Sequence, residues 1–95
     1  MLSIVSDPAG DVVHIHGDLA GLEVLERAVA QLKEIVAAGG CQDSHLFSAS
    51  WGGSELTETM LEQEHSAGWT QVNHIKLFGW TQDWSARHGL SSDAP

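Results

Sequence analysis

The strongest constraint on the fold is a long apolar stripe between Asp18 and Gly39. Aliphatic side chains recur there at three- and four-residue steps, the spacing that gathers them on one face of an α-helix. They are Leu22, Leu25, Ala28, Val29, Leu32, Ile35 and Val36. Asp18 is a residue type that caps helix N-termini, and Gly39-Gly40 is a common stop. The sequence therefore predicts one helix over residues 18–38, roughly 30 Å long and able to cover a small sheet.

The other apolar segments are short and β-branched, which is typical of strands. Residues 2–6 and 11–16 flank Asp7-Pro8-Ala9-Gly10, a turn sequence, and predict a β-hairpin. Residues 44–50 and 71–80 predict two more strands. The acidic segment 54–67 is predicted to hold a helical turn or a mobile loop. The order β-β-α-β-β predicts an α+β fold, with one long helix packed on one face of an antiparallel sheet of about four strands.

Length and hydropathy indicate one small domain that does not enter a membrane. The chain has 95 residues, of which 42% are hydrophobic and 18% charged, as in globular proteins. We expect a single domain over residues 1–90 and a disordered tail over 91–95. No apolar run approaches the roughly 20 residues that cross a bilayer. The first residues lack the basic start of a secretory signal, so we expect a cytoplasmic location.

The charge balance bears on the choice of partner. Thirteen acidic residues against four basic ones give a formal charge of −9. This field repels phosphate backbones, so we expect no nucleic-acid partner. It attracts a basic protein. An acidic surface that merely keeps the protein soluble is the alternative.

A candidate partner site follows the third predicted strand, where Trp51-Gly52-Gly53 leads into an acidic run. Tryptophan is favoured at interface hot spots, and glycine permits backbone conformations closed to other residues. The predicted partner-binding residues are Trp51, Gly52, Gly53, Glu55, Glu58, Glu62 and Trp69. Two alternatives stay open: Trp51 as a buried plug that holds the turn, and the acidic run as a solvated loop. Further along the chain, Trp80 is predicted in the core and Trp84 on the surface.

Six histidines raise the question of a metal site. His14 and His16 are two apart on one strand and share a face, which His74 and His45 could join. Such imidazoles could bind zinc with a glutamate or water completing a tetrahedron. No HExxH or CxxC motif accompanies them, so we expect no cofactor and no high-affinity metal site. A small histidine-based metal-binding protein or metal-dependent enzyme remains the alternative.

Catalysis is not predicted by any other pattern. Histidines could transfer protons, with Glu55, Glu58, Glu62 and Glu64 as candidate carboxylates. The sequence has no nucleophile elbow and no phosphate-binding glycine loop. We therefore expect a non-enzymatic protein, and a structural homodimer joined through the open sheet face is a further alternative.

Three motifs spread over most of residues 12–80 carry a family resemblance. They are HIHGDLAGL at 14–22, His45-Leu46 followed by WGGSEL at 51–56, and VNHIKL at 72–77. Together they resemble the bacterial immunity protein 32 family. The resemblance implies a cytoplasmic protein, made beside the toxin of a polymorphic toxin system, that blocks the toxin in the producing cell. The acidic charge would suit a basic toxin.

Overall fold

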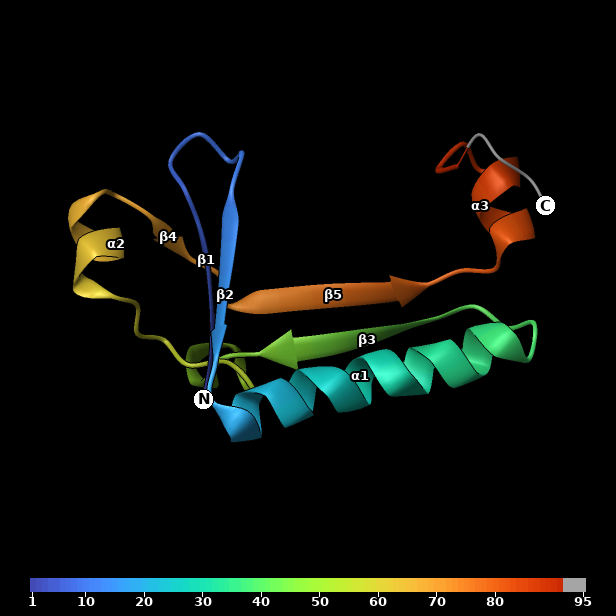
Figure 1. The fold of residues 1–95 in the computed structure, drawn as a ribbon, viewed down its shortest axis with the longest axis horizontal. Helices are drawn as coiled ribbons and strands as arrows, with labels where there is room; N and C mark the ends of the chain where they lie inside the picture. Colours follow the sequence, from blue (N-terminus) through green and yellow to red (C-terminus); the bar gives the residue numbers. More distant parts are fainter. Residues whose placement is uncertain (92–95) are drawn as a thin grey trace.

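Two separate antiparallel sheets form the framework of the computed structural model, which describes residues 1–91 (Figure 1). One sheet has the order β2-β1-β4, from β1 (Leu2–Ser6), β2 (Val13–Gly17) and β4 (Thr70–Gln71). The other pairs β3 (Gln42–Phe47) with β5 (His74–Gly79). The helices are α1 (Leu19–Ala37), the 3-10 turn η1 (Ala49–Trp51), α2 (Glu62–Ser66) and α3 (Gln82–Arg87). The α+β class is confirmed, but the described residues form five strands in two sheets instead of about four strands in one.

Helix α1 begins and ends within one residue of the predicted 18–38. The Asp18 side chain accepts a hydrogen bond from the backbone N–H of Gly21 at 3.0 Å, which satisfies one free donor of the first turn. The helix packs on the β3-β5 sheet and buries Ala28 and Leu32. Leu22 and Val29, from the same stripe, remain exposed. The stripe is therefore wider than the surface that the small sheet offers.

A single core joins the two sheets. Leu2 and Ile4 of β1 meet Ala28 of α1, Leu46 of β3 and Leu56 of the following loop. The opposite face of β1 is also closed, because Ser3 and Val5 are buried as well. The segment after η1 covers part of that face. There the Ser3 hydroxyl donates to the carbonyl of Thr59 at 2.8 Å. Strand β1 is thus central in both senses, between two strands and between two layers.

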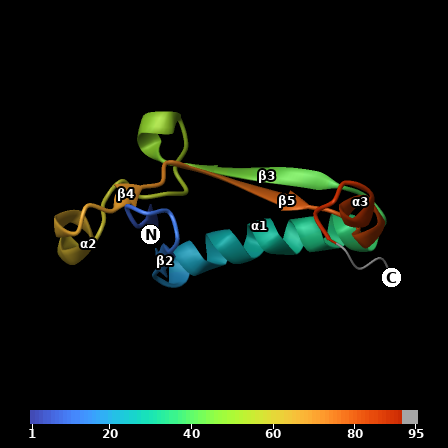
Figure 2. The same ribbon diagram turned by 90° about the horizontal axis from the view of Figure 1, so that it is seen from above.

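The molecule is elongated. Its principal extents are 44 × 28 × 22 Å, and its radius of gyration is 15.4 Å, against about 12 Å for a compact chain of this length. Helix α1 and the β3-β5 pair extend away from the β2-β1-β4 sheet, and α2 and α3 lie at opposite ends of the molecule (Figures 1 and 2). A relatively large share of the chain is therefore available for contact.

Several local predictions are resolved by these elements. The acidic segment holds a helical turn, α2, and the polar stretch after Trp80 forms α3. The assignment of Trp80 to the core and Trp84 to the surface is wrong. Both are half-buried, and their rings stack with centroids 3.7 Å apart. Residues 92–95 of the predicted tail lie outside the described residues.

Candidate functional site

Strand β2 presents two histidines on the face of its sheet that lies away from Leu2 and Ile4. Antiparallel register places His16 opposite Ser3 and His14 opposite Val5, and directly opposed residues share a face. Ile15, between the histidines, is opposite Ile4 instead. The period-two alternation of the strand therefore sets both imidazoles on the same side, as predicted.

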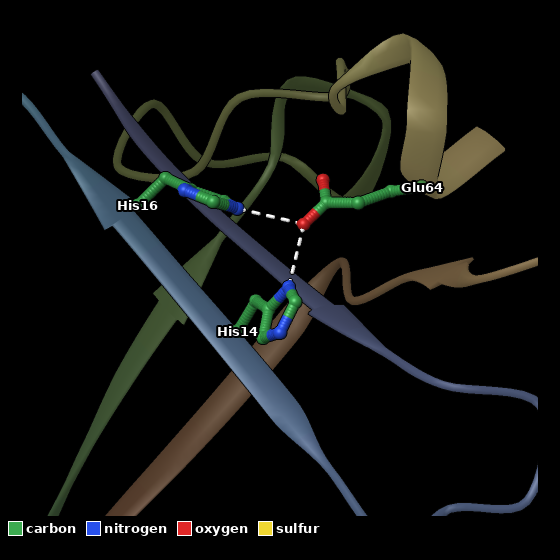
Figure 3. A group of neighbouring side chains, drawn as sticks. All are labelled: His14, His16 and Glu64. Atoms are coloured by element: carbon green, nitrogen blue, oxygen red, sulfur yellow. Dashed lines mark hydrogen bonds and ion pairs between the residues drawn. The ribbon is translucent and has the colours of Figure 1, made fainter. Parts of the chain in front are cut away.

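Helix α2 brings a buried carboxylate between these imidazoles. Glu64 Oε2 lies 2.8 Å from His14 Nδ1 and 2.7 Å from His16 Nε2 (Figure 3). Its other oxygen, Oε1, accepts a hydrogen bond from the backbone N–H of Leu61 at 3.0 Å, at the start of α2. Only 3% of Glu64 is exposed. Its carboxylate is thus held by three donors from two parts of the chain.

The hydrogen bonds decide the charge of Glu64. The bond from His16, followed by those from His14 and the Leu61 N–H, outweighs burial and lowers the pKa of Glu64 to about 2. Burial alone would raise it. The carboxylate is therefore ionised at neutral pH. Trp69 closes one side of the cluster, with its ring centroid 4.1 Å from that of His14.

Three residues of metal-ligating types converge in this cluster. One ligand atom each from His14, His16 and Glu64 lies within 4.8 Å of the other two. Among the described residues 1–91, these three side chains form a group that could hold a metal ion. From the sequence, Glu64 is one of several candidate carboxylates, and nothing in the sequence predicts that it lies beside His14 and His16.

The other two candidate histidines form a separate pair on the β3-β5 sheet. His45 Nδ1 lies 2.8 Å from His74 Nε2, and the rings stack. Phe47 stacks on His74 in turn, with centroids 4.3 Å apart. The expectation that four histidines share one sheet face is therefore wrong, because the strands that carry them belong to different sheets.

Trp51 ends η1 and is 58% exposed, so the alternative of a buried plug is wrong. Gly52 follows with φ +89°, a conformation that glycine adopts at little cost. At Gly53 a Cβ would lie 2.4 Å from that of Phe47, so only glycine fits without a shift. The turn is therefore fixed by its two glycines, while more than half of Trp51 remains exposed.

Carboxylates next to Trp51 fold back onto the same loop. Glu58 Oε1 accepts the backbone N–H of Ser50 at 2.6 Å, and Glu55 Oε2 accepts that of Ser54 at 2.7 Å. Hydrogen bonds from Ser50 and from the backbone of Ser54 lower the pKa of Glu58 and of Glu55, respectively. Both remain charged near Trp51 at neutral pH.

The predicted partner site is divided by the fold. Trp51, Gly52, Gly53, Glu55 and Glu58 occupy the η1 loop. Glu58 and the exposed Glu62 line one hollow of about 340 Å³, so an acidic surface continues from the loop onto α2. Trp69 belongs instead to the His14–His16–Glu64 cluster.

Comparison of the chain with protein-family models, with curated proteins and with solved structures gives no match. The resemblance to the immunity protein 32 family thus stays a prediction from its motifs. None of the helices within residues 1–91 combines the length and apolar character that crossing a membrane requires.

Proposed function

We propose that this chain is a non-enzymatic, immunity-type protein that acts in the cytoplasm and neutralises a cognate bacterial toxin by direct contact. The observation that carries the proposal is the exposed indole of Trp51 on a fixed turn. Large aromatic side chains that lose their water on binding are the usual anchors of protein interfaces. The motifs that resemble the immunity protein 32 family suggest that this partner is a toxin.

Rigidity of the η1 loop favours this role. The backbone N–H groups of Trp51 and Gly53 both donate to the carbonyl of Ser48, at 3.0 and 2.9 Å. Ser48 is fully buried, and its hydroxyl donates to Asn73 Oδ1 at 2.8 Å. A side chain presented by a loop that is already ordered loses less conformational entropy on binding.

Charge suggests that the toxin is basic. Glu58 and Glu62 border the same hollow beside the Trp51 loop, and the whole chain carries −9. Opposite charge accelerates the encounter with a basic protein. A second copy of this chain would be repelled by the same field, which makes a homodimer the less favoured partner.

The proposal is tested with the products of the genes on either side of this one. Each is expressed with and without this chain, and growth and binding affinity are measured. We expect one neighbour to be toxic, to be neutralised by the wild-type chain, and to bind Trp51→Ala far more weakly. Leu90→Ala, which truncates an exposed apolar side chain outside the loop, is the control and should protect fully. Equal protection by a folded Trp51→Ala protein would contradict the proposal.

A further inference from the structure

We propose that His14, His16 and Glu64 form a binding site for a divalent transition metal, preferably Zn²⁺, with three protein ligands and an open fourth position. Two imidazole nitrogens and one carboxylate oxygen are ligands that zinc accepts, and sites with three protein ligands leave room for an exchangeable one. None of these three ligands is among the residues proposed to contact the toxin, Trp51, Glu58 and Glu62.

Ligand spacing is close to what zinc needs. Both nitrogens already approach the same oxygen, Glu64 Oε2, at 2.7 and 2.8 Å. Zn–N and Zn–O bonds of roughly 2.0–2.2 Å in a tetrahedron place ligand atoms about 3.3 Å apart. Each nitrogen–oxygen separation must therefore widen by about half an ångström, and the two nitrogens, which lie within 4.8 Å of each other, must reach the same spacing. His14 would bind through Nδ1 and His16 through Nε2.

The surroundings hold the three ligands in place. Glu64 Oε1 is occupied by the Leu61 N–H, which leaves Oε2 turned toward the imidazoles. Trp69 packs on the ring of His14 and restricts its rotation. Groups that orient the ligands in this way raise the affinity of metal sites. The sequence predicts no high-affinity metal site because it does not reveal that Glu64 lies next to the two histidines. Its near-complete burial between the histidines changes that expectation.

Space for a fourth ligand lies next to His16. A hollow of about 200 Å³ is lined by His16 together with Ser3, Thr57, Thr59 and Met60. This volume exceeds what one water molecule needs, and the hydroxyl groups offer hydrogen-bond partners for it. A water molecule in this hollow beside His16 is the candidate for the fourth ligand.

The second histidine pair supplies a matched control. His45 faces His74 through Nδ1, but the nearest carboxylate, Asp43, contacts His45 through its other nitrogen, Nε2, at 3.3 Å. The three groups therefore do not converge on one point. This group also combines two histidines with a carboxylate, here that of an aspartate, but it lacks the geometry of the proposed site.

The test is zinc titration calorimetry on protein without an affinity tag. We expect one zinc ion per chain with a dissociation constant of about 1 µM or lower. His16→Ala should weaken binding by roughly a hundredfold or more, since losing even an outer-shell partner costs up to that much. The double variant His45→Ala/His74→Ala should bind as the wild type does. Circular dichroism establishes that each variant is folded.

A second measurement needs no variant. In wild-type protein, nitrogen-detected NMR of the histidine rings should show zinc shifting the His14 and His16 signals and leaving those of His45 and His74 unchanged. Absence of stoichiometric zinc binding, shifts confined to His45 and His74, or undiminished affinity in folded His16→Ala would each overturn the proposal.

Discussion

At the scale of single residues, Glu64 and Trp51 both depart from the usual distribution of side chains, in opposite ways. Glu64 is a charge removed from water, and it is tolerated because two imidazoles and one backbone N–H replace the lost hydration. Trp51 is a large apolar ring of which more than half stays in water. The first residue stabilises the structure, and the second is available to a partner.

Acid should destabilise the protein through Glu64. Its pKa is about 2 in the folded chain against an ordinary 4.5, so the folded state binds this proton less readily than the unfolded state. A lowered pKa gives stability that is complete above about pH 4.5 and is lost as the pH falls toward 2. The groups that face the carboxylate are His14, His16 and the Leu61 N–H. We expect the urea midpoint to fall across this range more steeply for wild type than for Glu64→Gln. Parallel curves would contradict the assignment.

Trp51→Ala should leave stability nearly unchanged and weaken partner binding. Surface substitutions usually change stability by no more than about 0.5 kcal/mol, whereas truncation of an aromatic hot spot costs on the order of 2–4 kcal/mol of binding. The loss should appear as faster dissociation. Charge reversal at Glu58 and Glu62 should instead slow association, and added salt should shrink that effect. Thermal melting and surface plasmon resonance on the same variants measure both.

At the scale of elements, only some of the apolar side chains of α1 are buried against the rest of the protein. Leu32 is 7% exposed and faces the sheet, whereas Leu19, at the first turn, is 74% exposed. The chemical identity of the two residues is the same, and their surroundings differ. Position around and along the helix axis therefore decides what each contributes.

Leu32→Ala should cost about 2–5 kcal/mol of unfolding free energy, because it removes buried methyl groups and leaves a cavity. Leu19→Ala, the matched control, should change stability by no more than about 0.5 kcal/mol. Urea denaturation of the two variants measures both values. Similar losses in the two would mean that α1 does not pack as described.

The elements differ in how far the sequence could predict them. Helix α1 and the β1–β2 hairpin depend on neighbours a few residues away, and both were predicted with nearly correct bounds. The division into two sheets depends on β4 returning to β1, where Gln71 pairs with Val5. No local pattern encodes that pairing. The pairing of β4 with β1 also brings α2 toward β2. The contact of Glu64 with His14 and His16 therefore could not be predicted from the sequence either.

The same limit applies to Trp51 and to the histidines of β3 and β5. A tryptophan before two glycines fits a buried turn and an exposed one equally well, because the sequence does not say which face of the loop meets the core. His45 and His74 were assigned to a common face with His14 by alternation, but alternation fixes a side within one sheet only.

At the scale of the whole molecule, the chain is long and thin for its size, and it carries Trp51 and the histidine–glutamate cluster on different elements. The η1 loop follows β3, whereas the histidine–glutamate cluster lies between β2 and α2. Occupation of one site therefore need not obstruct the other. A metal at the cluster would stabilise α2 against β2 without covering Trp51.

The central place of β1 also governs the order in which the molecule assembles. Its pairing with β2 closes a short loop, whereas its pairing with β4 must bring Gln71 to Val5 across most of the chain. Longer closures cost more entropy and slow the formation of the contacts that depend on them. The hairpin and α1 should thus fold first, and α2 should dock late and open first. Native-state hydrogen exchange should find the amide of His65 less protected than that of Val5, which is buried in β1 opposite His14 of β2, and zinc should slow the exchange at His65 selectively.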